Sequence, residues 1–302
     1  MVETKRQIER RIAVPGAFGI EQHRPLRAGQ NVLRADVTMA ATTTADVQTT
    51  DQPALLSIDG AVATITLNRP TAFNSINLAI AQTLEQLAAQ IAADDTIRVV
   101  IIEGNGRAFC AGGDLQTLGH AGDKIIPVVH ELLSHYHAFI ATLRQMPKIV
   151  IASVHGSAAG AGLSLAFIAD MCIATSDAKF TAAYNKLGVS PDGGGTIGVT
   201  EIVGSRRALQ IFLAEDSFSA QQAYDWGLVA KVVPPEDLKT ATKELAQRIA
   251  RNAPASIKTT KELIHAASST PVVQQLEAEA HGIAGCMQTE PYRVAVAKFL
   301  GK

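Results

Sequence analysis

Three glycine-rich segments contain the residues of this sequence that are best suited to chemistry. They are Arg107–Asp114 (RAFCAGGD), His155–Gly162 (HGSAAGAG) and Pro191–Thr196 (PDGGGT). The glycine-rich segments have no lysine in the position that a phosphate-binding loop requires, so a phosphate-binding loop of that kind is not predicted. The first two segments follow apolar strands, and the second opens a predicted helix whose free N–H groups can face an anion. Backbone donors at two strand ends are the components of an oxyanion hole.

Two side chains in or beside these segments could react, Asp192 and Ser164. Asp192 could act as a base, or it could be a solvated side chain in a Pro-Asp-Gly turn, which is favourable turn chemistry in any protein. Gly162–Ala166 (GLSLA) is close to the GxSxG elbow of serine hydrolases. That elbow needs its serine on a sharp turn directly after a strand, whereas Ser164 is expected in the first turn of a helix. A serine hydrolase is therefore the weaker alternative.

Histidines and cysteines do not form a metal-binding pattern. His135 and His137 are two residues apart on a predicted helix, so their side chains point to different sides. His137 lies beside the apolar stripe of that helix, where a histidine at the edge of the core is the ordinary interpretation. Cys110, Cys172 and Cys286 lack CxxC spacing, which is typical of a reducing compartment without disulfides or zinc sites. We expect no metal and no redox cofactor.

Alternating strands and helices are predicted around these segments. Val99–Ile102 (VVII) is apolar on both faces, and this favours an α/β sheet that is covered by helices. The uncharged stretch 149–169 is interpreted as a buried strand, turn and helix rather than a membrane span. The expected strands are 55–67 (a hairpin that turns at Asp59-Gly60), 99–102, 149–154 and 171–174, and the expected helices are 76–92, 127–145 and one from about 162.

Composition limits the class of protein. The chain has 302 residues, 47% of them hydrophobic, and a formal net charge of -1, so it can bury a large core and has no basic face for nucleic acid. Residues 1–52 contain several arginines and little apolar periodicity, which predicts a flexible N-terminal extension before a domain at 53–302. The first residues lack the apolar region of a secretory signal, so a cytoplasmic protein is expected, with an organellar transit peptide as the minor alternative.

Taken together, the motifs resemble the crotonase (enoyl-CoA hydratase/isomerase) superfamily from about residue 54 to the end of the chain. The resemblance implies a spiral of ββα turns over about 53–250 and a helical region over about 251–302 that is used in trimerisation. It further implies acyl-CoA thioester substrates and a homotrimer or a dimer of trimers. The matching segments, in order, are Leu67–Ile76, Ala108–Asp114, Ile151–Gly162, Pro191–Thr196, Ile202–Arg207 and Trp226–Val229.

The same resemblance implies which residues hold the substrate. The N–H groups of Gly113 and Ala161 would form the oxyanion hole, with Gly112 and Gly160 beside them. Coenzyme A would enter as part of the substrate, so no separate cofactor is implied. The residues expected to bind the thioester and its coenzyme A are Ala72, Phe73, Ala111, Gly112, Gly160 and Ser164, with Phe299 and Lys302 closing on it.

The acidic residues differ from the hydratase pattern of this superfamily. Ser164 and Tyr184 stand where hydratases have two glutamates. Water addition needs one group to activate water and another to handle the α-proton, so hydratase activity is not expected. Asp192 matches the single acid of members that shift double bonds, and PDGGGT looks most like the 1,2-epoxyphenylacetyl-CoA isomerase group. The sequence therefore predicts an enoyl-CoA or ring-epoxide acyl-CoA isomerase in which Asp192 is the acid/base, while Tyr184 and His137 shape the site.

Two alternatives remain within the superfamily. His137, Tyr184 and Asp192 also occupy positions where halobenzoyl-CoA dehalogenases have a histidine, an aromatic residue and a nucleophilic aspartate, although tyrosine replaces their tryptophan. The other alternative is a catalytically idle member that binds acyl-CoA. The sequence does not name the acyl group.

Overall fold

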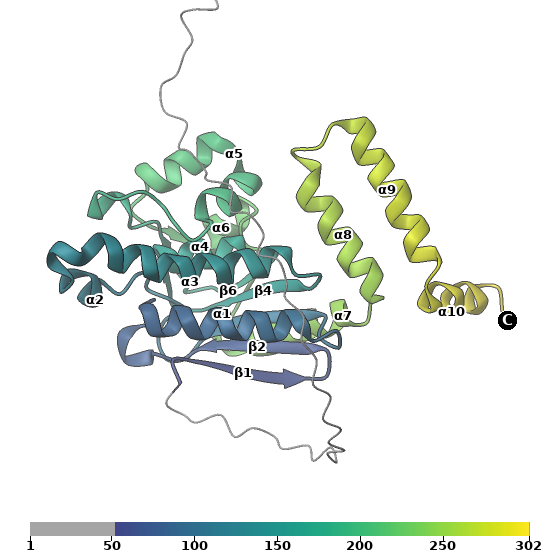
Figure 1. Ribbon diagram of the computed structural model, residues 1–302, viewed down its shortest axis with the longest axis horizontal. Helices are drawn as coiled ribbons and strands as arrows, with labels where there is room; N and C mark the ends of the chain where they lie inside the picture. Colours follow the sequence, from purple (N-terminus) through teal and green to yellow (C-terminus); the bar gives the residue numbers. More distant parts are fainter. Residues whose placement is uncertain (1–51, 302) are drawn as a thin grey trace, which may run out of the picture. The chain divides into compact units, whose positions relative to one another are not determined.

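A six-stranded sheet lies at the centre of residues 52–301, the part of the chain that the computed structural model describes (Figure 1). The strand order is β1-β2-β3-β4-β6-β9. β1 and β2 form an antiparallel hairpin, and each later strand runs parallel to its neighbour. The strands are β1 (Ala54–Asp59), β2 (Val62–Leu67), β3 (Val99–Gly104), β4 (Ile149–Val154), β6 (Met171–Thr175) and β9 (Lys231–Val233).

Both faces of this sheet are buried, as the apolar strands predict. Val100 and Ile102 of β3 lie in the larger apolar cluster, whereas Val99 and Ile101 of the same strand lie in a second cluster. Side chains of a strand alternate between its faces, so these two clusters cover opposite faces of the sheet. Helix α7 (Leu238–Ala250) packs on the face of the second cluster. The predicted α/β class is confirmed.

The two long helices on the other face form where helical periodicity predicts them. Helix α1 (Leu78–Ala93) begins after Asn77, whose side chain accepts a hydrogen bond from the N–H of Ile80. Helix α3 (Ile125–Gln145) packs along α1, and Figure 1 shows the two helices side by side. Each buries an apolar stripe in the larger cluster, so α1 and α3 cover the same face of the sheet.

A smaller sheet and two further helices follow β4. The sheet has the order β5-β7-β8, with β5 at Ser157–Ala159, β7 at Lys179–Thr181 and β8 at Phe218–Ser219. Helix α4 (Ala161–Ile168) is buried along its whole length and packs on α5 (Gly195–Leu213). The stretch 149–169 is thus strand, turn and helix, as predicted. In residues 52–301 no helix has both the length and the apolar character that crossing a membrane requires.

The C-terminal part is helical, as expected. Buried Lys261 of helix α8 (Pro254–Ala267) donates a hydrogen bond to the Leu143 carbonyl and so joins α8 to the end of α3. Helices α9 (Val272–Met287) and α10 (Glu290–Phe299) contain no buried residue. The shorter helices are α2 (Leu115–Gly119) and α6 (Ala220–Asp225). The predicted extension lies outside the described residues except for residue 52, so its boundary stays a prediction.

Candidate active site

A rigid loop after β2 supports the first glycine-rich segment. Asn74 is fully buried in the left-handed conformation, with a φ of 57°. Its side chain accepts a hydrogen bond from the N–H of Arg69 and donates to the carbonyls of Asn105 and Ala108, which fixes the β2 loop against the loop after β3. Arg69 in turn forms an ion pair of 2.9 Å with Asp114. Burial opposes ionisation of Asp114, but hydrogen bonds from the Thr117 N–H and from Arg69 hold its pKa below the ordinary value.

The first and second glycine-rich segments touch each other through their backbones. The N–H of Cys110 donates to the Ser157 carbonyl at 3.1 Å, and the N–H of Ala159 donates to the Cys110 carbonyl at 2.9 Å. Gly112, with a φ of +97°, lies so close that a Cβ there would be 2.8 Å from the Ala159 oxygen and 3.4 Å from the Ala161 nitrogen. Only a glycine at position 112 allows the two backbone segments to come this close. The close contact places Gly112 and the following residue, Gly113, next to the start of α4.

Two N–H groups at this junction have no acceptor among the described residues. They belong to Gly113 and Ala161, the residues predicted as oxyanion donors. Ala161 is the first residue of α4, so its N–H has no partner within the helix, and the helix dipole favours negative charge there. Gly160, the residue before the helix, has a φ of +50° that turns the chain into it. The arrangement supplies two unpaired donors for a developing oxyanion.

Asp192 is joined to α4 by two hydroxyl groups. The Tyr184 hydroxyl donates to Asp192 Oδ1 at 2.7 Å and lies 2.9 Å from the Ser164 hydroxyl. Ser164 is 0% exposed and Tyr184 is 7% exposed. Burial, followed by the negative charge of Asp192, raises the pKa of Tyr184 well above its ordinary value, so this hydroxyl keeps its proton. The predicted site residues Ser164, Tyr184 and Asp192 are therefore brought together in one chain of contacts.

His137 faces the same loop from helix α3. The N–H of Gly193 donates to its Nε2 at 3.3 Å, so this nitrogen is the acceptor in that contact. Asp192 and His137 line one open cavity of about 490 Å³ together with Arg144 of α3 and apolar and small residues of α3, α4, α5 and the PDGGGT loop. Among the residues that line it, Asp192 is the one with a carboxylate.

Ser164 does not have the geometry of a hydrolase nucleophile. It is the fourth residue of α4, not a residue on a sharp turn after a strand. Its hydroxyl contacts Tyr184, which is protonated and cannot serve as the base that a nucleophilic serine needs. These observations argue against the serine hydrolase alternative.

The residues predicted to hold coenzyme A are only partly brought together. The N–H of Ala111 donates to the Phe73 carbonyl at 3.0 Å, and Ala72 precedes Phe73 in the same turn. The Phe73 ring is 43% exposed, and the Arg107 guanidinium lies 5.1 Å from its centre. Phe299, at the end of α10, is 90% exposed and so does not close on this turn within one chain. Lys302 lies outside the described residues.

Tyr136 of α3 contacts the site, although no motif of the sequence singles it out. It is fully buried, and its hydroxyl donates to the Ala161 carbonyl at 3.0 Å. Its ring also lies 2.8 Å from where a Cβ of Gly193 would be, so it touches both the start of α4 and the Asp192 loop. A buried tyrosine needs a hydrogen-bond partner for its hydroxyl. A tyrosine within the apolar stripe of a predicted helix is therefore the one sequence feature that could have pointed to this contact.

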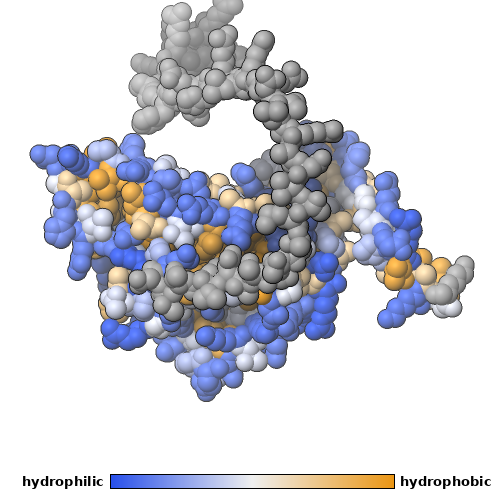
Figure 2. Space-filling view, turned by 60° about the horizontal axis from the view of Figure 1, so that its bottom comes forward, coloured by the Kyte–Doolittle hydropathy of each residue, from blue (hydrophilic) through white to orange (hydrophobic). Residues whose placement is uncertain are grey.

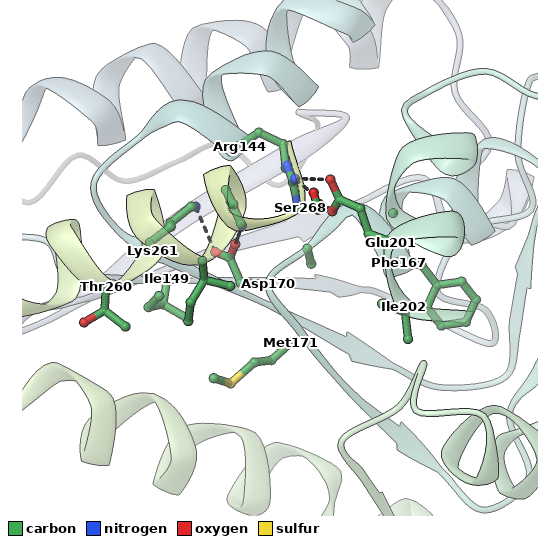
Figure 3. A pocket seen from close by; sticks show the side chains of 14 residues that line it. Arg144, Ile149, Phe167, Asp170, Met171, Glu201, Ile202, Thr260, Lys261 and Ser268 are labelled. Carbon is green, nitrogen blue, oxygen red and sulfur yellow. Dashed lines mark hydrogen bonds and ion pairs between the residues drawn. The ribbon is translucent and has the colours of Figure 1, made fainter. Parts of the chain in front are cut away.

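A second cavity, of about 390 Å³, lies between α8, α5 and the sheet (Figure 3). Lys261 forms an ion pair of 2.8 Å with Asp170, and His265 contacts the other Asp170 oxygen at 3.0 Å. Burial would raise the pKa of Asp170, but hydrogen bonds from His265 and Lys261, with the charge of Lys261, hold it below its ordinary value. The apolar wall and paired charges indicate a structural cluster that anchors α8. No group of three or more possible metal ligands occurs in residues 52–301.

Comparison with known proteins identifies the family. A family model described as enoyl-CoA hydratase/isomerase matches residues 57–302. The chain belongs to this family. Among curated relatives of this enoyl-CoA hydratase/isomerase family protein, the 1,2-epoxyphenylacetyl-CoA isomerase of Escherichia coli K12 is 36% identical over 253 residues, which cover 82% of this chain and 95% of that one. The trans-2-decenoyl-[acyl-carrier-protein] isomerase of Streptococcus mutans is 33% identical over 211 residues, 70% of this chain and 80% of that one.

A solved structure agrees with the predicted fold. The enoyl-CoA hydratase of Polaromonas sp. JS666 is 33% identical and superimposes with a TM-score of 0.78 over 82% of this chain and 96% of that chain. The predicted crotonase-like fold is confirmed. The relatives include both isomerases and hydratases, so the choice between the two reactions rests on the side chains of the site.

Proposed function

We propose that this family member is an acyl-CoA isomerase that moves a double bond, or rearranges a ring epoxide, with Asp192 as its single acid/base. The observation that carries the proposal is the single carboxylate that lines the cavity beside α4. It is linked through Tyr184 to Ser164, on the helix whose first N–H is an unpaired donor. The name of the Escherichia coli relative supports this reaction class.

The proposed double-bond shift uses the two backbone donors and this carboxylate. The thioester oxygen lies between the N–H groups of Gly113 and Ala161. A carboxylate oxygen of Asp192 removes a proton from the α- or γ-carbon, and the electron pair of that C–H bond moves into a dienolate whose charge is on the thioester oxygen. Asp192 then returns the same proton two carbons away. No atom is gained or lost, so one acid suffices.

Hydration would require a second acid/base group, and the positions that could supply it hold hydroxyls. Ser164 is fully buried, and Tyr184 keeps its proton because its pKa is raised. We therefore expect no water addition. The dehalogenase-like alternative would need the imidazole of His137 as a base, but its Nε2 already accepts the hydrogen bond from Gly193. This contact favours the isomerase.

Product mass separates these reactions. The purified protein would be incubated with a straight-chain enoyl-CoA, an aromatic ring-epoxide acyl-CoA and a halobenzoyl-CoA, and the products would be identified by liquid chromatography with mass spectrometry. An isomerase gives a product of unchanged mass and new retention time. A product heavier by one water would contradict the proposal, and so would release of halide. Binding of every thioester without any product would identify an idle member.

We also propose that the C-terminal helices join chains into a trimer or a dimer of trimers. Figure 2 shows apolar, orange atoms near the end of the chain at the right of the view. A single chain leaves these side chains in water, which is unusual for so many large apolar residues on neighbouring helices. Closed cyclic assembly would cover them on every copy. The exposed apolar residues of α9 and α10 are Val272, Val273, Leu276, Ile283, Met287, Tyr292, Val294 and Phe299.

A further inference from the structure

The buried hydroxyl groups of Ser164 and Tyr184 are linked to Asp192 by hydrogen bonds and have no part in the proposed proton transfer itself. Ser164 belongs to α4, and Tyr184 follows the short strand β7. Both are withdrawn from solvent and touch the Asp192 loop: a Cβ at Gly195 would collide with the Ser164 hydroxyl. A buried hydroxyl loses free energy unless it is hydrogen-bonded, so the direction of each bond in this group is constrained.

The order of donors and acceptors can be worked out from the number of protons. An ionised carboxylate only accepts, so the single proton of the Tyr184 hydroxyl is donated to Asp192 Oδ1. The Tyr184 oxygen can then only accept in its 2.9 Å contact with Ser164, which must be the donor. The chain therefore runs one way, from Ser164 through Tyr184 to Asp192. Burial maintains this order, because it raises the pKa of Tyr184 and so keeps the tyrosine hydroxyl protonated.

The two oxygens of Asp192 are consequently not equivalent. Oδ1 accepts from Tyr184, whereas Oδ2 has no hydrogen-bond partner among the described residues. A carboxylate held through one oxygen loses rotational freedom, and the other oxygen faces its substrate in a fixed direction.

We propose that Ser164 and Tyr184 are positioning residues that form a one-way hydrogen-bond chain to Asp192 and leave Oδ2 as the oxygen that exchanges the proton with the substrate. This inference rests on the proposed role of Asp192 as the acid/base. It also assigns Ser164 a role away from the substrate, in contrast to its predicted place among the substrate-binding residues.

The test is the pH dependence of kcat in the variant Tyr184→Phe, measured on whichever thioester the wild-type protein isomerises. The variant keeps the ring and removes the donor. The midpoint of the acid limb should rise by about one to two pH units, the worth of a hydrogen bond to a charged group. Ser164→Ala should raise it by less, because Tyr184 can still donate. KM should change little, since neither hydroxyl is placed against the substrate.

Matched variants separate positioning from packing. Ser153→Ala removes another buried serine hydroxyl, one that contacts the Thr242 hydroxyl of α7 at 3.1 Å, and should leave the acid-limb midpoint in place. In the double variant Tyr184→Phe/Ser164→Ala, the midpoint should equal that of Tyr184→Phe, because Ser164 acts only through the tyrosine.

Three outcomes would overturn the inference in different ways. If Asp192→Asn loses turnover while Tyr184→Phe and Ser164→Ala keep the wild-type midpoint, the hydrogen-bond chain has only a packing role and the proposed function stands. If Asp192→Asn keeps wild-type turnover, the acid/base assignment fails and the chain fails with it. Additive midpoint shifts in the double variant would refute the one-way order.

Discussion

Replacing Gly112 with alanine should lower the turnover of the thioester reaction by ~10²–10³-fold, about the cost of losing one oxyanion donor. The added Cβ would lie 2.8 Å from the Ala159 oxygen and 3.4 Å from the Ala161 nitrogen, so the two loops must separate. That separation displaces the neighbouring N–H of Gly113 from the N–H of Ala161. A side chain at a φ of +97° adds a backbone cost of roughly 1–2 kcal/mol.

Gly60→Ala is the matched control for this variant. Gly60 lies in the hairpin turn with a φ of +60°, and a Cβ there would meet nothing within 4 Å. It therefore introduces backbone strain without a collision. Steady-state kinetics should show a large fall in kcat with little change in KM for Gly112→Ala, and wild-type kcat for Gly60→Ala. A Gly112→Ala protein that stays folded by circular dichroism and keeps kcat within about threefold of wild type would refute the oxyanion-hole geometry.

Three further predictions concern stability and assembly. Asp170→Asn breaks a buried ion pair and should cost ~3–5 kcal/mol in urea unfolding at neutral pH. Because the folded pKa of Asp170 is lowered, the stability that it contributes is present above the unfolded value of 3.8 and is lost as pH falls through the folded pKa, so the gap between variant and wild type should narrow at pH 3; an unchanged gap would contradict this. Light scattering should give a mass of three or six chains, and a monomer at micromolar concentration would disprove the assembly proposal. A protein that starts at Met39 should keep its melting temperature and activity, and a large loss of either would show that residues 1–38 are required.

Local patterns were sufficient to predict the main elements. The doubly apolar run Val99–Ile102 is buried on both sides, and the stretch 149–169 folds as strand, turn and helix. The periodicity of 76–92 and 127–145 places α1 and α3 to within two residues at either end. The short strands β5 and β8 were not predicted, because two or three residues carry too little periodicity and pair only through contacts distant in sequence.

The candidate site, too, could be predicted from the sequence only in part. Glycine-rich loops after apolar strands indicated backbone donors, and the N–H groups of Gly113 and Ala161 at the junction have no acceptor within residues 52–301. The chain from Ser164 to Asp192 could not be predicted, since its members are separated by 8 and 20 residues and meet only when the small sheet has formed. Asn74 was likewise unpredicted in its role, because its partners lie in the loop after β3.

The turnover of Asp192→Asn on the thioester that the wild-type protein isomerises tests the central claim most directly. The substitution keeps the volume of the side chain and removes the base. We predict that kcat falls by ~10²–10⁴-fold, as expected for the loss of general-base assistance, with little change in KM. A variant that retains nearly wild-type kcat would contradict the account and would make Asp192 a turn residue of the Pro-Asp-Gly sequence.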